Sequence, residues 1–209
     1  MSFYRMKTAA TILCYAIATW SGFFVMAIEL LGARLLAPTF GSSIYVWGAL
    51  ITVFMLALSI GYLAGGRYSM RSPTLRKLGM ILFLAAIAAL PTIVWSENLL
   101  ETIAAATSDP RYGSLLAAMV LFLVPTALSG MVSPYAVRLL IRERASAGRH
   151  AGQLYFASTF GSAAGTLLTS FYLVLWLELN QILFSMISVS ILLGLCAMLP
   201  AAQRGYVDP

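Results

Sequence analysis

The sequence predicts an all-α fold, a polytopic membrane bundle of six transmembrane helices, and three observations lead to it. Of the 209 residues, 61% are hydrophobic and only 10% are charged, and the mean hydropathy is +0.90. This composition leaves too little polar surface to cover a water-soluble globule. The apolar residues fall into six long runs, and the positive charges gather in alternate connections between them. We therefore expect residues 1–209 to form a single integral membrane domain.

Each run is long enough to cross a bilayer, because a hydrocarbon core of about 30 Å needs roughly 20 helical residues. The predicted spans cover residues 9–31, 43–63, 78–95, 115–134, 154–177 and 181–199. The first run is too long for a secretory signal and lacks a small-residue cleavage site, so we expect it to remain as a span. Cys14 and Cys196 lie inside apolar runs and predict no metal or redox motif.

The Lys and Arg residues predict the orientation through the positive-inside rule. All 13 of them except Arg34 and Arg111 precede the first span or follow the second, fourth or sixth. The opposite connections carry Glu97, Glu101 and Glu178. We expect both termini to be cytoplasmic, in a bacterial cytoplasmic membrane.

The net charge of +6 is also compatible with a nucleic-acid surface. The basic residues, however, form short clusters without interleaved aromatic residues, so no nucleic acid is expected. Anionic headgroups of the lipid bilayer are the expected partner.

The longest outer connection, 96–113, carries Leu99, Leu100 and Ile103 at helical spacing. This pattern predicts a short helix in the membrane interface, ended by Asp109-Pro110.

Two hexapeptides resemble each other. Residues 37–42 (APTFGS) and 157–162 (ASTFGS) share five of six residues, and they fall in regions of oppositely directed spans. A 3+3 inverted repeat would produce this relation, as in many transporters. A chance match among residues common in membranes is the alternative.

Glu29 is the first candidate site residue, because a carboxylate inside an apolar run costs about 2–3 kcal/mol. We expect it to face the bundle interior, before a helix break at Pro38, and to hold a cation, a proton or an amine. A structural pair is the alternative. Arg34 lies about 140° around the helix from Glu29, so it is not expected to be that partner.

The connection between the first two spans is the second candidate. Ser42 or Ser43 is expected to cap the second helix, whose free N–H groups could bind an anion. Alternatively, this is a simple helix start with Tyr45 and Trp47 in the interfacial aromatic belt.

The inner ends of the second, fourth and fifth spans carry further candidates. Gly61 and Gly65 predict a close helix contact, followed by Arg67 at headgroups or a neighbouring helix end. In the fifth span, a smooth packing face is predicted from Gly148, Gly152, Gly161, Ser162, Ala164 and Gly165.

Pro134 is expected to break or kink the fourth helix beside Ser133 and Arg138. Such a break would line a cavity in a transporter, whereas a simple kink would be structural.

The candidate binding residues are therefore Glu29, Arg34, Ser43, Tyr45, Trp47, Arg67, Ser133 and Arg138. No paired carboxylates, nucleophile with a base, metal cluster or nucleotide-binding loop appears. No catalytic residue, metal or cofactor is expected, and the chain is not expected to be an enzyme.

Five blocks resemble the membrane domain of fused spermidine-synthase-like proteins. They are residues 29–38 (ELLGARLLAP), 40–47 (FGSSIYVW), 61–67 (GYLAGGR), 130–138 (GMVSPYAVR) and 159–166 (TFGSAAGT). In that family a soluble aminopropyltransferase domain of Rossmann type usually follows the membrane helices. This sequence ends at Pro209, so the resemblance implies a membrane module associated with polyamine-type chemistry, without aminopropyl transfer by this chain.

Two functions follow from these observations. The first is a non-enzymatic membrane subunit or anchor that recruits a separate enzyme or joins a larger complex, as a homo-oligomer or a hetero-complex. The alternative is a small-solute transporter, for an amine or polyamine, that uses Glu29 in an intramembrane site.

Overall fold

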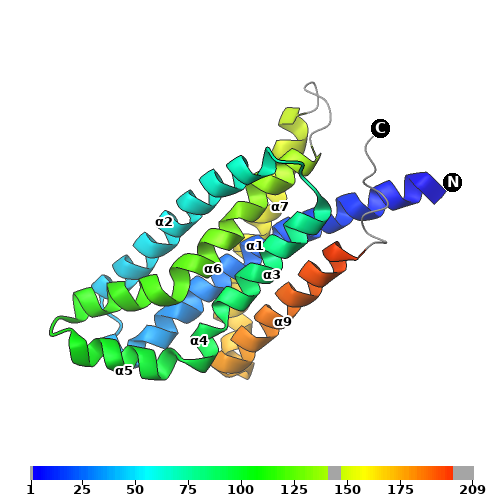
Figure 1. The fold of residues 1–209 in the computed structure, drawn as a ribbon. Coiled ribbons are helices and arrows are strands. Elements are labelled where there is room, and N and C mark those ends of the chain that lie inside the picture. The colour runs from blue at the N-terminus through cyan, green and yellow to red at the C-terminus, as the bar shows by residue number, and fades with distance from the viewer. Residues whose placement is uncertain (1, 141–146, 200–209) are drawn as a thin grey trace.

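The computed structural model describes residues 2–140 and 147–199, with side chains from residue 9 onward, and this part of the chain contains helices and no strands. Figure 1 shows how the helices are arranged. The elements are α1 Ser2–Phe40, α2 Ile44–Ser69, α3 Leu75–Ala89, α4 Pro91–Val94, α5 Ser96–Ala106, α6 Pro110–Leu140, α7 Ala147–Leu168, a π-helix η2 Thr169–Leu173, α8 Val174–Trp176 and α9 Leu179–Met198.

Six helical stretches are long and apolar enough to cross a membrane, which confirms the predicted all-α, multi-pass class. They are Ala9–Phe40, Ile44–Ser69, Leu75–Val94, Pro110–Leu140, Ala147–Trp176 and Leu179–Met198. Each contains nearly all of one predicted span, and several extend beyond it.

The predicted break at Pro38 was wrong, because α1 continues through this proline to Phe40. Pro38 lies in the last turn, where a helix has few backbone bonds left to lose. A break at Pro134 was also wrong, since α6 runs unbroken through Pro125 and Pro134. Figure 1 shows α6 bending along its length, as expected of a helix that contains prolines.

The predicted short helix after the third span is confirmed as α5. Its apolar side packs inside the protein, because Leu100 and Ile103 are buried in the core with residues of α1 and α6. Glu97 and Glu101 lie on the exposed side of the same helix. Figure 1 shows α5 across one end of the bundle.

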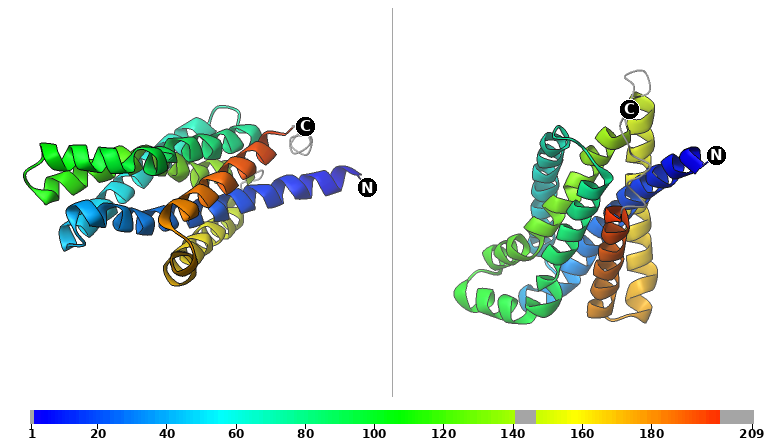
Figure 2. Two further views of the ribbon diagram at one scale, coloured as in Figure 1. Left: turned by 90° about the horizontal axis from the view of Figure 1, so that it is seen from below. Right: turned by 45° about the vertical axis from the view of Figure 1, so that its right-hand side comes forward.

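The bundle has two distinct ends. We call the end where α1 begins and α9 finishes the terminal end, and it also carries the α2–α3 connection (Figures 1 and 2). The opposite end, called the loop end, carries the α1–α2 turn, α5 and the α8–α9 turn. One apolar cluster around Phe24, Phe54 and Phe122 includes α5 residues of the loop end. A second cluster around Ile17, Leu78 and Tyr135 lies nearer the terminal end.

Glycines bring α2 directly onto α6, as predicted for Gly61 and Gly65. A Cβ atom at Gly65 would lie 2.5 Å from the Met131 carbonyl oxygen, and one at Gly61 would overlap the Ala127 carbonyl. Without side chains at these positions, the two backbones approach closely along their length.

The contact of α7 with α1 is built in the same way. Gly161 lies against the Thr19 carbonyl and Gly165 against the Phe23 carbonyl. The predicted smooth face of this helix is therefore right for these two glycines. It is wrong for Gly148 and Gly152, which face open space, because a Cβ atom added at either would have no neighbour within 4 Å.

A third close crossing joins α3 to α9. Gly79 meets the Gly194 carbonyl, and Gly194 meets the Gly79 carbonyl, so the contact is reciprocal. Side chains of α3 also pack onto α6, and this places α3 between α9 and the central pair α1 and α6.

Candidate functional site

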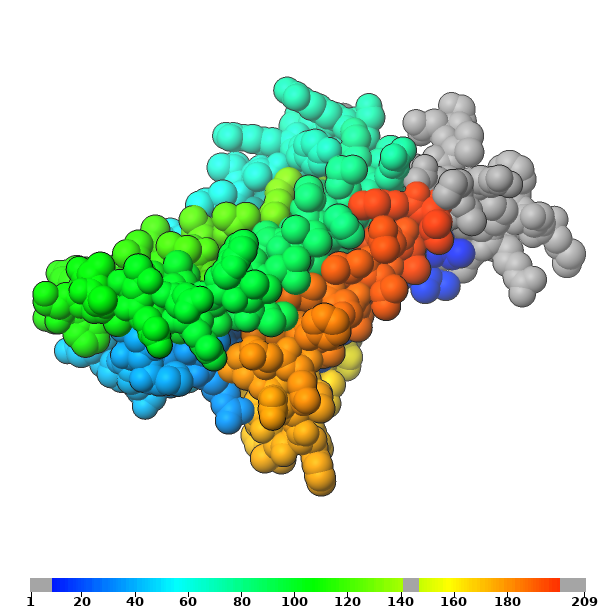
Figure 3. Space-filling view, turned by 60° about the horizontal axis from the view of Figure 1, so that its bottom comes forward, coloured from blue at the N-terminus to red at the C-terminus, as the bar shows by residue number. Residues whose placement is uncertain are grey.

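A cavity of the loop end, called the acidic pocket, lies between α1, α4, α5 and α9 and has a volume of about 500 Å³. Its lining residues are Arg34, Leu35, Pro38, Thr39, Ile93, Ser96, Glu97, Leu100, Glu101, Glu178, Leu179 and Asn180. Figure 3 shows the surfaces of α1, α5 and α9 meeting at this place.

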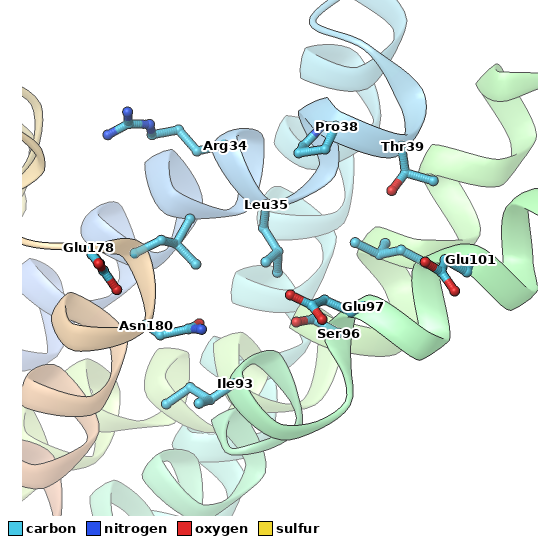
Figure 4. A pocket seen from close by; sticks show the side chains of 12 residues that line it. Arg34, Leu35, Pro38, Thr39, Ile93, Ser96, Glu97, Glu101, Glu178 and Asn180 are labelled. Carbon is cyan, nitrogen blue, oxygen red and sulfur yellow. The ribbon is translucent and has the colours of Figure 1, made fainter.

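Negative charge dominates the acidic pocket. Glu97 and Glu101 come from α5 and Glu178 from the start of α9, whereas Arg34 is the one basic residue of the lining. Figure 4 shows the Arg34 side chain directed away from Glu97 and Glu101. None of these four residues forms an ion pair with another described side chain, so the carboxylates keep their capacity for a cationic ligand.

Two of these carboxylates lie at the starts of helices, which determines their positions. Glu97 lies in the first turn of α5, where the helix dipole favours negative charge. Glu178 is the N-cap residue of α9, and its side chain accepts a bond from the backbone N–H of Gln181 while the Gln181 side chain accepts from the Glu178 N–H.

Ser96 adds a largely buried polar residue to the lining. Its relative exposure is only 4%, and its hydroxyl makes no hydrogen bond within the described part of the chain. Figure 4 shows Asn180 directed toward Ser96 and Glu97 across the cavity. Buried polar groups usually have a partner, so this hydroxyl is available to a ligand.

A second cavity of about 400 Å³, called the lateral pocket, lies between α1, the start of α2 and η2. Apolar side chains of α1 and α8 line it together with Arg34, Ser42, Trp47, Thr169 and Ser170. Arg34 borders both pockets. The Thr169 hydroxyl is buried and has no hydrogen-bond partner among the described residues.

Thr169 is the first residue of the π-helix η2. Such turns are frequent at functional sites. One turn earlier, Thr166 has the ordinary α-helical arrangement, in which its hydroxyl donates to the Ser162 carbonyl at 3.0 Å.

Of the predicted candidates, Arg34 and Trp47 line the lateral pocket together, and the backbone N–H of Trp47 donates to the Ser43 carbonyl at 3.3 Å. Ser43 is the N-cap residue of α2, but the expected capping bond from its side chain is absent. Tyr45 is exposed, and the Arg111 guanidinium lies 5.4 Å from the centre of its ring. That guanidinium also pairs with Asp109 at 2.8 Å, and its hydrogen bonds to this half-buried carboxyl lower the pKa of Asp109.

Glu29 is half-buried in the middle of α1 and lines neither pocket. It forms no ion pair with Arg34, as the angle between them predicted. The expected partner is absent among the described side chains. Because Glu29 lies seven residues beyond Gly22, both project from the same face of α1, and Gly22 packs against α7 beside Ser158 and Ser162.

The remaining candidates lie toward the terminal end. Arg67 and Arg138 are exposed, and Ser133 is half-buried with its hydroxyl 3.4 Å from that of Ser158. The eight predicted residues therefore do not form one site.

Sequence reasoning missed the acidic pocket because its residues come from three distant segments. The available signal was the concentration of Glu97, Glu101 and Glu178 in the outer connections. Within the described chain, no group of three or more His, Cys, Asp or Glu side chains is placed to hold a metal ion. Glu97, Glu101 and Glu178 therefore do not form a three-carboxylate metal site in the part of the chain that the structure describes.

Comparison with family models, curated proteins and solved structures found no match to this chain.

Proposed function

We propose that this chain is a non-enzymatic membrane subunit that carries a small amine across the bilayer as part of a larger assembly. Two observations support this proposal. The glycine-mediated helix crossings repeat between the two halves of the chain, as in many transporters, and the acidic pocket favours an amine as the substrate.

The crossings repeat with constant shifts in residue number. Adding 100 converts the α2 pair Gly61 and Gly65 into the α7 pair Gly161 and Gly165. Their backbone partners follow with a shift of 108, because Thr19 and Phe23 of α1 become Ala127 and Met131 of α6.

The same shifts also relate the reciprocal contacts. Gly22 of α1 meets Ser158 of α7, and Gly130 of α6 meets Leu58 of α2. Exchanging α1 with α6 and α2 with α7 therefore reproduces both contacts. The mutual contact of Gly79 with Gly194 is compatible with an exchange of α3 and α9.

These relations support two inverted three-helix units, one of α1, α2 and α3 and the other of α6, α7 and α9. Inverted units are frequent in secondary transporters, where rocking of one part against another exposes a central site to either side. The two similar hexapeptides, residues 37–42 and 157–162, do not occupy equivalent positions in these two units. Gly41 lies in a turn with φ of 80°, whereas Gly161 lies within α7.

The acidic pocket favours an amine. Its three carboxylates line one cavity of about 500 Å³ without converging on a point, and an extended molecule with several ammonium groups could contact them separately. This class agrees with the family resemblance of residues 29–38. We propose that the chain is related to the membrane domain of spermidine-synthase-like proteins, and the five sequence blocks are the support for this relation.

Glu29 is proposed as the intramembrane carboxylate that the amine meets between the two ends. It is one helical turn before Ala33, which lines the lateral pocket, on the same face of α1.

The test is uptake of radiolabelled spermidine into liposomes that contain the purified protein. We expect Glu29→Gln to reduce uptake at least tenfold and Glu97→Gln or Glu101→Gln to weaken spermidine binding about 2–5-fold each, as for exposed ion pairs. Asp109→Asn is the matched control, because it removes a carboxylate from the same end outside the pocket. Unchanged uptake with Glu29→Gln, or an equal effect of Asp109→Asn, would refute the proposal.

An anchor that recruits a separate cytoplasmic enzyme is the second candidate. The exposed Arg67 and Arg138 near the terminal end favour it, since they offer a basic surface to a partner. Purification in mild detergent should then retain a stoichiometric soluble protein, and this protein should be lost when both arginines are replaced by glutamine.

A further inference from the structure

We propose that the face between α2 and α7 is covered by a second copy of this chain. Any role of this dimer in transport rests on the proposed function. The contact between the two copies does not depend on it.

Each of these two helices carries a stripe that consists mainly of small and hydroxyl-bearing residues. In α2 it consists of Gly48, Thr52, Met55, Ser59, Tyr62 and Gly66. In α7, the same shift of 100 gives Gly148, Gly152, Tyr155, Thr159, Ser162 and Thr166. The alternating spacing of four and three residues places each stripe on one side of its helix. All of these residues are exposed or half-buried.

The two stripes border a common face. The side chains of Tyr62 of α2 and Tyr155 of α7 lie near each other. Between the two helices, Tyr15 of α1 donates to the Gln153 side chain at 3.2 Å, and Ser133 of α6 meets Ser158. We call this surface the polar face.

Several groups on the polar face lack a hydrogen bond. The hydroxyls of Tyr62, Tyr155, Thr159 and Ser162 have no partner within the described chain. A polar group without a partner in hydrocarbon costs several kcal/mol, so lipid chains are a poor cover for this surface.

The outer side of α3 provides the contrast. Its exposed membrane-spanning side chains are Met80, Leu84 and Ile87, which lipid chains solvate well. The polar face also carries the exposed Met55, and Ile51 lies beside it on α2. Its hydroxyls without a partner nevertheless distinguish it from the exposed spanning part of α3, which is apolar throughout.

A second copy satisfies the polar face better than an unrelated apolar helix would. Hydroxyls both donate and accept, so a surface rich in Ser, Thr and Tyr complements itself across a two-fold axis. Gly48, Gly66, Gly148 and Gly152 face open space and would let the backbones of the two copies approach. Two six-helix units around an axis along the membrane normal also form the common twelve-helix transporter arrangement.

Disulfide cross-linking in liposomes tests this contact. The background carries Cys14→Ala and Cys196→Ser, because Cys196 is exposed on α9. Single cysteines are introduced as Thr159→Cys or Ser59→Cys on the polar face and as Leu84→Cys on α3. After mild oxidation we expect a band of twice the monomer mass for at least one polar-face variant and none for Leu84→Cys.

Equal cross-linking of Leu84→Cys, or monomers alone in every variant, would overturn the proposal. So would a polar-face cross-link in native membranes to a polypeptide of another mass, which would identify a different protein as the cover. As a check independent of cysteine, Gly152→Leu should raise the concentration of half-dissociation at least tenfold in light scattering, whereas Leu84→Ala should leave it unchanged.

The outcomes separate the dimer from transport. Cross-linked copies without spermidine uptake would leave the contact standing and remove the transport role. Uptake by a protein that stays monomeric in nanodiscs and liposomes would leave transport standing and remove the contact.

Discussion

At the residue scale, neighbouring glycines in α2 have opposite surroundings. A Cβ atom added at Gly65 would lie 3.0 Å from the Met131 carbonyl carbon of α6, whereas one added at Gly66 would have nothing within 4 Å. Backbone atoms on the far side of a contact cannot move aside as a flexible side chain can. The first glycine is therefore required by packing, and the second is not.

We expect Gly65→Ala to lower the free energy of unfolding in detergent by about 1–3 kcal/mol, because the added methyl group overpacks the α2–α6 crossing. Gly66→Ala should be neutral or stabilise the protein by up to about 1 kcal/mol, since alanine favours the helix. Thermal or SDS-induced unfolding followed by circular dichroism measures both. Equal effects of the two substitutions would show that α2 does not cross α6 at Gly65.

The sequence predicted some site residues and missed others for a physical reason. Arg34 and Trp47 flank the connection between α1 and α2, and short separations along the chain make proximity predictable. The acidic pocket joins Arg34 to Glu97 and Glu178, and only the packing of α1, α5 and α9 brings them together. No local periodicity encodes that arrangement.

At the element scale, the sequence predicted helix type well and helix ends poorly. Hydropathy identified all six spans, because composition alone determines whether a segment suits hydrocarbon. The breaks predicted at Pro38 and Pro134 are absent, since neighbouring helices can support a helix that contains prolines. The kink that was the alternative at Pro134 is compatible with the bend of α6 (Figure 1). The π-helix at η2 had no sequence signal, because a one-residue shift of register leaves the apolar pattern nearly unchanged.

The helix α5 links packing to the acidic pocket. It carries Glu97 and Glu101 on its exposed side and holds its position through Leu100 and Ile103 in the core. We expect Leu100→Ala to cost about 2–5 kcal/mol of stability, as for other large-to-small core substitutions. Because α5 is then less firmly positioned, spermidine binding should also weaken.

Thr102→Ala is the control for α5. Thr102 is exposed, and its hydroxyl bonds only to the Asn98 carbonyl of the same helix. Unfolding curves and equilibrium binding of labelled spermidine should both stay close to those of the unchanged protein. Loss of spermidine binding in Thr102→Ala would contradict the claim that the packing of α5 positions the acidic pocket. Full binding in a destabilised Leu100→Ala would contradict it as well.

At the scale of the whole molecule, charge divides between the two ends of the bundle. Arg71, Arg76 and Lys77 follow α2 near the terminal end, whereas the acidic pocket and the Asp109–Arg111 pair belong to the loop end. Each Lys or Arg beside anionic lipid contributes about 1 kcal/mol. The basic end should therefore remain on the cytoplasmic side, and the acidic pocket should open on the opposite side.

Single cysteines at the two ends test this orientation, in a chain that carries Cys14→Ala and Cys196→Ser. Ser108→Cys lies in the connection before α6, and Arg71→Cys lies in the exposed connection before α3. In intact bacterial cells, a membrane-impermeant maleimide should label Ser108→Cys and leave Arg71→Cys unmodified until the membrane is permeabilised. Leu84→Cys, on the lipid-facing side of α3, should resist the reagent in both conditions and so report on membrane insertion. The reverse pattern would place the three pocket carboxylates in the cytoplasm, where the proposed amine would enter from inside and the direction of transport would be export.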